Sequence, residues 1–317
     1  MTEINMKHPN FFLVGASKAG TTSLYHYLKQ HPDIFMCPEK EPSHFLFPYG
    51  VPPLMFSDDL MSHSFRENIK NAPRVFPTRE EYIAMFDGVR EEKIIGEASP
   101  DYLIGPDTPQ AIFEFAPSAK IMLILRNPFD AAYSEFLMNQ RDGEFKEGAT
   151  FLELLSAEDL SDRDLQKLPK LIRTRFYSKH INRYLEVFPK DQMRCFLFED
   201  LYNMDQLLND AFEFLGVSTQ IRIDTTLKYN AAKAQTIDYR TDLIRNLIPP
   251  SIKSGLKKTI PASFYSWYWN RRLGVHQSEK LPVKCPEDAK EYLMPIFTPA
   301  IQELEELLER DLSLWLK

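Results

Sequence analysis

A short segment near the start of the chain combines two glycines, a lysine and two threonines: residues 15–22 have the sequence GASKAGTT. An apolar run, FFLV, precedes the segment, and residues with helical spacing follow it. In a strand-to-helix turn of this kind, backbone N–H groups and the positive end of the helix dipole can surround an anion. The segment therefore indicates a site for a phosphate-like group, with a plain strand-to-helix turn as the alternative.

The position of the lysine argues against a nucleoside triphosphate site. The two glycines have the spacing of a Walker A loop, in which Lys and then Ser or Thr follow the second glycine directly. Here Thr21 follows Gly20, and Lys18 precedes it. An NTPase also needs an Asp at the end of a neighbouring strand to hold Mg²⁺, but the apolar run at 121–125 ends in Arg126. A cation there suits a second phosphate, so we expect a doubly anionic nucleotide that needs no metal ion.

A second group of reactive side chains lies in the segment KEPSHF at residues 40–45. Glu41 is the candidate general base, because a positioned carboxylate can take the proton of an acceptor hydroxyl. His44 is the alternative base, since the pKa of an unperturbed imidazole is about 6.5. Lys40, next to Glu41 in the sequence, could place a positive charge beside the group that reacts. Taken alone, the sequence leaves open a solvated carboxylate, a hydrogen-bonding histidine and a surface lysine.

Strands alternating with helices must position these residues. This alternation implies a mainly parallel sheet covered on both faces, so we predict an α/β fold and a single domain over residues 1–317 with a helical C-terminal part. Residues 46–80, with several prolines and aromatic residues, predict an irregular lid on the acceptor side. Apolar runs predict strands at 11–15, 34–36, 94–96, 121–125 and 194–198, and periodicity and capping residues predict helices at about 21–30, 128–140, 172–188 and 207–215, followed by an apolar helical stripe at 293–312 that Pro295 and Pro299 break.

Composition and charge exclude several classes of protein. With 317 residues, 44% of them apolar, the chain can bury a substantial core. The net charge of −7 argues against general nucleic-acid binding, which needs a basic excess. The three cysteines are far apart and form no zinc-binding pair, and no apolar run is long enough for a signal-peptide core or a membrane span. We therefore expect a soluble, cytoplasmic protein without an integral membrane segment.

Together these segments resemble the sulfotransferases that use 3′-phosphoadenosine 5′-phosphosulfate (PAPS), especially a bacterial branch similar to animal heparan sulfate sulfotransferases. KAGTTSL at 18–24 resembles the family's 5′-phosphosulfate loop, and LRNPFDAAYSE at 125–135 resembles its 3′-phosphate motif. KEPSHF at 40–45 resembles the segment that carries the general base in this branch. The match keeps its order over nearly the whole chain, because GEASPDYL at 96–103, FYSKHINRYL at 176–185, NAAK at 230–233 and RDLSLW at 310–315 also fit.

The resemblance implies a P-loop-like central sheet and a role for each matched residue. Lys18 would contact the bridging oxygen between phosphate and sulfate and neutralise the leaving group. Arg126 and Ser134 would hold the 3′-phosphate, Tyr177 would lie near the nucleotide, and Lys233 would close over the 3′-phosphate side. Backbone and hydroxyl donors to the 5′-phosphate would come from Ala19, Gly20, Thr21, Thr22 and Ser23.

Two departures from the family pattern affect the acceptor side. The animal heparan branch often has Lys where this chain has Ala98, and KEPSHF is one residue longer than the usual segment. The second departure leaves either Glu41 or His44 facing the acceptor. Glu97, next to Ala98, would either orient Lys18 or the acceptor, or be a structural carboxylate.

The resemblance implies in-line transfer of a sulfuryl group from PAPS to an acceptor hydroxyl, with Glu41 as the base and Lys18 stabilising the leaving group. The heparan branch favours a carbohydrate acceptor. Aromatic residues in 46–80 and 264–269 could line its site, and they would equally suit a lipid or small-molecule alcohol. A P-loop nucleotide phosphotransferase and a non-catalytic nucleotide-binding module are the alternative functions.

Overall fold

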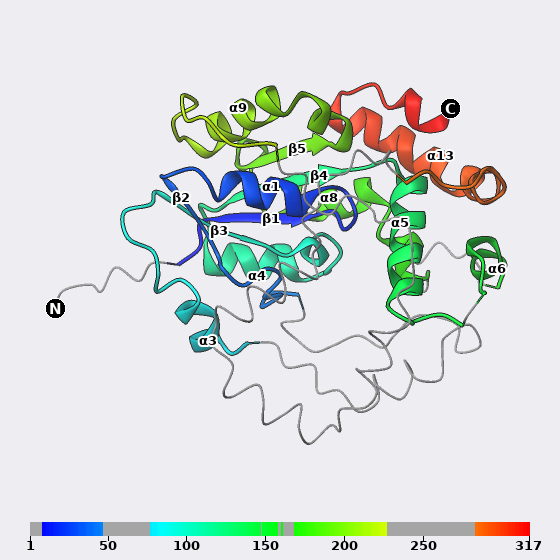
Figure 1. Cartoon of the computed structure of the whole chain (residues 1–317), viewed down its shortest axis with the longest axis horizontal. Helices are drawn as coiled ribbons and strands as arrows, with labels where there is room; N and C mark the ends of the chain where they lie inside the picture. The colour runs from blue at the N-terminus through cyan, green and yellow to red at the C-terminus, as the bar shows by residue number, and fades with distance from the viewer. Residues whose placement is uncertain (1–7, 47–76, 147, 158–159, 161–167, 227–282) are drawn as a thin grey trace, which may run out of the picture. The chain divides into compact units, whose positions relative to one another are not determined.

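The computed structural model describes residues 8–46, 77–146, 148–157, 160, 168–226 and 283–317 (Figure 1). The described residues up to Ile223 and from Val283 onward form one compact unit. Residues 224–282 fall in a second unit, of which only 224–226 are described. The prediction of one domain over residues 1–317 therefore stays a prediction.

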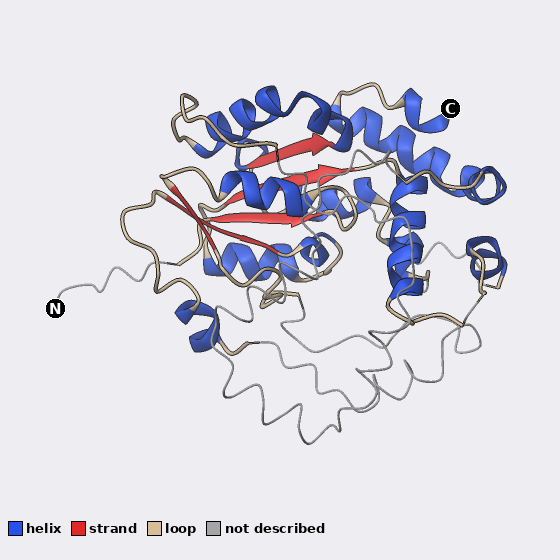
Figure 2. Cartoon of the chain, in the orientation of Figure 1, coloured by secondary structure: helices blue, strands red, loops and turns tan. Residues whose placement is uncertain are grey.

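A five-stranded parallel sheet forms the centre of the compact unit, in the order β2-β3-β1-β4-β5. Figure 2 shows helices on both sides of the strands. β1 (Phe11–Gly15) is buried along its whole length, and β4 (Lys120–Leu125) is buried from its second residue onward. Continuous apolar runs of this kind are typical of parallel strands covered on both faces. The other strands are β2 (Ile34–Met36), β3 (Ile94–Ala98) and β5 (Met193–Leu197).

The carboxyl ends of β1, β3 and β4 meet at one edge of the sheet, because β1 pairs in parallel with both neighbours. After β1 the chain builds β2 and β3 on one side and then crosses to β4 on the other. Loops at such a switch point form the usual ligand crevice of an α/β sheet. The elements that begin there are α1 (Thr21–Leu28) after β1, the 3₁₀ helix η1 (Pro100–Leu103) after β3, and α5 (Pro128–Arg141) after β4.

Several helix ends follow simple capping chemistry. The Asn127 side chain accepts a hydrogen bond from the backbone N–H of Phe129 at 3.0 Å and so caps α5, whose first residue is a proline as expected. Gly216, with φ 76°, ends α9 (Met204–Leu215) in the left-handed conformation that glycine adopts without strain. The predicted C-cap at this glycine is confirmed.

The C-terminal helix α13 (Glu287–Leu308) continues through Pro295 and Pro299, so the prediction that these prolines break it is wrong. Each proline removes one helical hydrogen bond. The helix persists because its other face is buried: Leu293, Phe297 and Leu304 are at most 1% exposed, and α13 packs against α5, α6 and α8. Tertiary packing of an apolar face outweighs the local cost of the prolines.

The helix predicted at 172–188 is divided into α7 (Lys170–Arg173) and α8 (Tyr177–Leu185), with Arg175 buried between them. Most of the predicted lid, 47–76, lies outside the described residues. Its last residues are not irregular, because Thr78 caps α3 (Arg79–Ala84). The remaining helical elements are α4 (Thr108–Phe115), α6 (Phe151–Ser156), η2 (Lys190–Gln192), η3 (Phe198–Asn203) and η4 (Ser313–Leu316).

The predicted α/β class is confirmed, with a central parallel sheet, flanking helices and a helical C-terminal part. All five predicted strands are present, and each boundary differs by at most two residues from the prediction. Within the described ranges, no helix is both long enough and apolar enough to cross a bilayer.

Candidate functional site

The loop between β1 and α1 is the centre of the candidate site. Its first residue is tied to the neighbouring strand, because the backbone N–H of Ala16 donates to Ile124 O of β4 at 2.7 Å. Lys18 (φ 67°) and Gly20 (φ 98°) have left-handed backbone conformations that turn the chain into α1. A Cβ at Gly20 would lie 2.7 Å from a side-chain carbon of Leu201, so both the backbone conformation and the space require glycine there.

The N-terminus of α1 has the electrostatics of an anion site. Gly20 is its N-cap and provides no capping side chain, and the first turn carries no acidic residue. The positive end of the helix dipole is therefore not offset by a carboxylate of α1 itself. Ala19, Thr21 and Thr22 are buried, and Ser23 is half-buried. These are the residues for which the family resemblance implies backbone and hydroxyl contacts with a 5′-phosphate.

Lys18 extends from this loop toward α5. Its Nζ lies 3.4 Å from the sulfur of Met138, and none of the described carboxylates forms an ion pair with it. Burial lowers the pKa of Lys18, and the charge of Glu135 on α5 opposes that shift. Glu135, rather than Glu97, is thus the carboxylate that acts on this lysine. A poorly solvated ammonium group without an ion-pair partner is suited to an anionic ligand.

Arg126 joins the end of β4 to the same loop. The side chain is 6% exposed, and Nη1 donates to Lys18 O at 3.2 Å while Nη2 donates to Val283 O at 2.6 Å. Its guanidinium group lies over the ring of Phe198, 4.7 Å from the ring centre. Burial lowers the pKa of Arg126, opposed by the charge of Asp130. Lys18 and Arg126, more than one hundred residues apart in sequence, therefore lie at one place.

Arg175, which was not predicted from the sequence, contacts the backbone of the loop. It is 1% exposed, Nη1 donates to Ser17 O at 3.0 Å, and Nη2 donates to Ala131 O at 3.3 Å and forms an ion pair with Glu135. This buried pair connects the loop to α5 and fixes the backbone next to Lys18. The sequence signal that could have indicated Arg175 is its position directly before Phe176 and Tyr177, in the segment LIRTRFY at 171–177.

Ser134 and Tyr177 lie on the helices beside the loop. Ser134 is half-buried on α5. Tyr177 begins α8, and its buried hydroxyl has no hydrogen-bond partner in the described part of the chain. Burial raises the pKa of Tyr177, and the charges of Arg175 and Arg126 act in the opposite direction. Tyr177 therefore shares its surroundings with both arginines.

The second part of the site is the strap, residues 41–45, which is attached to the carboxyl end of β3. The backbone N–H of Glu41 donates to Ala98 O at 3.0 Å, and that of Ser43 donates to Ser99 Oγ at 3.2 Å. Since β3 pairs with β1, these contacts place the strap at the same sheet edge as the Lys18 loop. Topology thus brings the two predicted parts of the site to one edge.

The side chains of the KEPSHF segment differ in their surroundings. The Glu41 side chain is 53% exposed and forms an ion pair with the half-buried Lys40. The His44 ring stacks on Tyr82 with 4.4 Å between ring centres, and its Nδ1 N–H donates to Pro77 O at 3.0 Å. Burial lowers the pKa of His44. Glu41 thus has the accessible position, and His44 is engaged in packing and in a backbone hydrogen bond.

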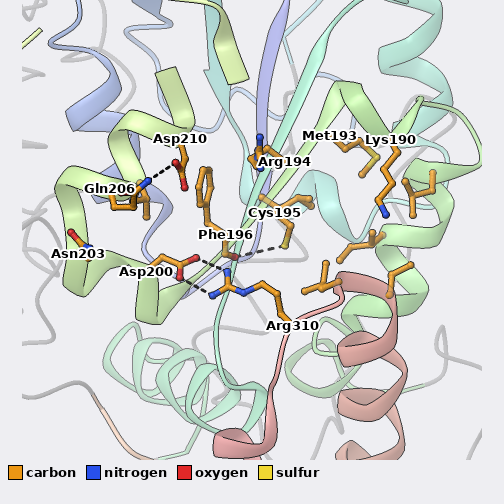
Figure 3. Close-up of a pocket in the computed structure, with 16 residues that line it drawn as sticks. Lys190, Met193, Arg194, Cys195, Phe196, Asp200, Asn203, Gln206, Asp210 and Arg310 are labelled. Atoms are coloured by element: carbon orange, nitrogen blue, oxygen red, sulfur yellow. Dashed lines mark hydrogen bonds and ion pairs between the residues drawn. The ribbon is translucent and has the colours of Figure 1, made fainter. Parts of the chain in front are cut away.

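The remaining predicted residues lie outside the described part of the chain: Lys233, the aromatic run at 264–269 and most of the lid. A cavity of about 520 Å³ lies elsewhere, at β5, α9 and the end of α13 (Figure 3). Figure 3 shows Cys195 and the Arg310–Asp200 ion pair, with N–O distances of 2.8 and 2.9 Å, at its wall. None of the predicted site residues lines this cavity. Searching the described residues for three or more metal-ligating side chains grouped together finds no cluster.

Comparison with known proteins is consistent across sequence and structure. Residues 8–290 match the family model of the sulfotransferase domain. The crystal structure of a sulfotransferase from Alicyclobacillus acidocaldarius is 30% identical in sequence and has a TM-score of 0.67, with 98% of this chain and 100% of that chain covered. The bifunctional heparan sulfate N-deacetylase/N-sulfotransferase 3 of Homo sapiens is 27% identical over 229 residues. Carbohydrate sulfotransferase 15 of Mus musculus is 24% identical over 259 residues.

The two curated relatives are longer proteins. The human match covers 71% of this chain and 24% of the relative, and the mouse match covers 66% of this chain and 44% of the relative. The chain therefore spans less than half the length of either one. The bacterial structure, by contrast, is matched along its whole length.

Proposed function

Because this chain belongs to the sulfotransferase family, we propose that it moves the sulfuryl group of PAPS to a hydroxyl group of a carbohydrate by in-line displacement. The observation that carries the proposal is the meeting of Lys18 and Arg126 at the N-terminus of α1, joined by the 3.2 Å hydrogen bond from Arg126 to Lys18 O. Two cations and a helix N-terminus at one place suit a donor with two anionic groups.

Lys18 is proposed to stabilise the leaving group. In sulfuryl transfer, as in phosphoryl transfer, negative charge accumulates on the leaving oxygen, and catalysis depends mainly on positioning and charge stabilisation. Lys18 is half-buried without an ion-pair partner among the described residues, so its charge is available for the 5′-phosphate. The buried Arg175–Glu135 pair holds the loop and so reduces reorganisation during the transfer.

Arg126 and Ser134 are proposed to hold the 3′-phosphate. Arg126 now donates to two backbone carbonyls and forms no ion pair with a described carboxylate. A guanidinium group can bind a phosphate through two parallel hydrogen bonds. Ser134, eight residues further on, adds a hydroxyl donor from α5. Tyr177 would pack near the nucleotide, since it lies beside both Arg126 and Arg175.

Glu41 is proposed as the general base. Among the three candidates of the KEPSHF segment it has the exposed carboxylate, and its backbone is fixed to Ala98 O at the sheet edge that also carries the donor loop. Lys40 now forms an ion pair with Glu41. When a bound acceptor breaks this ion pair, Lys40 would lie beside the sulfuryl group. His44 is the alternative base, and its packing on Tyr82 counts against it.

The proposed acceptor class is based on the names of the relatives, so several classes of acceptor must be tested. The names of the human and mouse relatives point to heparan sulfate and carbohydrate substrates. The human relative is an N-sulfotransferase by name, so an amine on a sugar is the second acceptor to consider. A lipid or small-molecule alcohol is the third.

An acceptor panel with labelled PAPS tests this proposal. The panel contains oligosaccharides with free hydroxyls, the same oligosaccharides with free amines, and lipid and aromatic alcohols. We expect label on a sugar hydroxyl, with transfer slowed by about 10²- to 10³-fold in a Lys18→Ala variant and no requirement for added metal. Label on an amine or an alcohol outside the sugar class would overturn the acceptor assignment, and transfer of phosphate from ATP would overturn the reaction itself.

A further inference from the structure

Glu97 is a buried carboxyl group that the proposed mechanism does not use. It lies on β3 with its side chain 0% exposed. Neither of its carboxyl oxygens has a hydrogen-bond partner among the described residues. Burial raises the pKa of Glu97 to about 8, and the hydroxyl groups of Tyr102 and Tyr82 oppose that rise. A carboxyl group in this position needs a structural or functional reason, because burying a polar group without partners is costly.

The groups that face Glu97 come from four different parts of the fold, and all of them are neutral acids. Tyr82 belongs to α3, Tyr102 to η1 and Tyr184 to α8, and Cys37 follows β2. Burial raises the pKa of each of the four, so none of them is ionised near neutral pH. Across the described part of the chain, no cation forms an ion pair with this carboxyl group. The pocket therefore accommodates a protonated carboxyl group and opposes an ionised one.

The strap rests directly on this pocket. The Tyr102 hydroxyl accepts a hydrogen bond from the backbone N–H of Phe45 at 3.1 Å. The Tyr82 ring stacks on His44 and meets the Phe45 ring edge-on, with 5.3 Å between centres. The first and the middle residue of the strap, Glu41 and Ser43, also donate backbone hydrogen bonds to Ala98 and Ser99, which directly follow Glu97 in the chain. The two tyrosines that lie against Glu97 are thus the two that support the strap.

We propose that Glu97 is a positioning residue: its neutral carboxyl group holds the rings of Tyr82 and Tyr102 as the support of the strap and thereby fixes Glu41 at the carboxyl end of β3. Neither carboxyl oxygen is hydrogen-bonded to a described residue in this structure, but the hydroxyls of Tyr82 and Tyr102 are close enough to affect its pKa. A protonated carboxyl has one O–H donor and an acceptor oxygen, so it can serve both of these hydroxyls at once. Ionisation places a negative charge among groups that cannot compensate it. The pocket then takes up water, and the strap loses its support. The role assigned to Glu41 rests on the proposed function, but the link from Glu97 to the strap does not.

Hydrogen exchange of the strap amides tests this link without any substrate. Full-length wild type and Glu97→Gln are compared between about pH 6 and about pH 10, with rates corrected for intrinsic exchange and with β1 amides as the internal reference. Glutamine keeps the size and the hydrogen-bonding groups of a neutral glutamic acid. In wild type we expect strap protection to fall by up to about tenfold for each pH unit as the pH rises to about 8, the folded pKa of Glu97, and to level off above it. In the variant we expect protection to stay constant. Equal protection of the two proteins over the whole range would overturn the proposal.

A spectroscopic measurement keeps the proposal testable if Glu97→Gln folds poorly. The infrared band of a protonated carboxyl group should be present in wild type at about pH 6.5 and should disappear near pH 8 in step with loss of strap protection. Glu303→Gln, a change at a partly exposed pair with Lys179, serves as the matched control and should leave the band in place. Absence of the band at about pH 6.5 would show an ionised Glu97 and would also overturn the proposal.

Binding of 3′,5′-adenosine bisphosphate in the same samples separates this inference from the proposed function. The loop between β1 and α1 contacts β4 and α5, so we expect Glu97→Gln to bind the bisphosphate as wild type does. Failure of both proteins to bind it would contradict the proposed function, and the exchange result would still decide the role of Glu97.

Discussion

The two sides of the candidate site differ in the charge of their buried side chains. On the β1–β4 side, two buried arginines contact a loop that carries a half-buried lysine, and the arginines are held mainly by backbone carbonyls. On the β3 side, the strap lies on an aromatic pocket that contains no cation among the described residues and encloses the carboxyl group of Glu97. The first side is prepared for an anion. The second is prepared to hold one exposed carboxylate, Glu41, in place.

Under the proposed function, this difference separates the two electrostatic tasks of group transfer. A leaving group needs fixed positive charge, and buried cations supply it with little reorganisation. A general base needs a carboxylate that reaches the acceptor, and a neutral support does not compete with it for the proton. The predictions below challenge each half of this comparison.

The largest effect is expected on the strap side, from Glu41→Gln. Loss of a general base lowers the transfer rate by about 10²- to 10⁴-fold. His44→Gln should lower it much less, because His44 is packed on Tyr82 and bonded to Pro77 O. Steady-state transfer rates of the two variants decide between the two bases, and the reverse order of effects would assign the base to His44.

The second largest effect is expected on the donor side, where Arg175→Met should lower the unfolding free energy. This change leaves Glu135 buried without its partner, which costs about 3–5 kcal/mol of unfolding free energy. Arg175→Met combined with Glu135→Leu should recover much of the loss, because no unpaired charge remains. Denaturant unfolding of the single and double variants measures both numbers. An unchanged midpoint in the single variant would show that the pair does not support the loop.

Lys18→Ala should affect the reaction more than donor binding. Removing a group that stabilises charge in the transition state lowers the rate by about 10²- to 10³-fold. Binding of the desulfated donor should weaken far less, since Arg126 and the helix N-terminus remain. A variant that loses binding and rate in equal proportion would assign Lys18 to holding the nucleotide rather than to the leaving group.

The smallest effect for a single step of one pH unit concerns the unfolding free energy as a function of pH on the strap side. The pKa of Glu97 is raised from an unfolded value near 4.5 to about 8 in the folded chain, so the folded state binds the proton more tightly. The stability from this group is full below about pH 4.5 and is lost as the pH rises to about 8, by at most about 1.4 kcal/mol per pH unit. Glu97→Gln should lack this slope. Unfolding free energies of both proteins across this range check it, and parallel curves would contradict it.

Strand positions and the donor loop could be predicted from the sequence because their signals are local. The run FFLVG, the two glycines and Arg126 directly after a buried strand each carry their meaning within a few residues. The sheet order then places the loop beside Arg126 without further information. Glu41 was singled out differently, by the resemblance of KEPSHF to a family segment, because the sequence alone left a solvated carboxylate open; its role stays a prediction.

Arg175, Glu135 and the surroundings of Glu97 could not be predicted, because their meaning depends on contacts across the fold. Arg175 contacts Ser17, 158 positions away in the chain. Glu97 meets tyrosines from α3, η1 and α8, and no local pattern indicates that a carboxyl group within GEAS is neutral. The prolines of α13 failed as helix breakers for a related reason, since the packing of the opposite face decided the outcome.

The most direct test of the central claim is calorimetric binding of 3′,5′-adenosine bisphosphate and of ATP–Mg²⁺ to wild type, Arg126→Ala and the control Arg222→Ala, an exposed arginine away from the loop. We predict that wild type binds the bisphosphate in the presence of a chelator. Arg126→Ala should weaken this binding by about 10- to 100-fold through loss of charge-assisted hydrogen bonds, and Arg222→Ala should bind as wild type does. Preference for ATP–Mg²⁺, or equal binding by Arg126→Ala and wild type, would contradict the assignment of Lys18 and Arg126 to a sulfuryl-donor site.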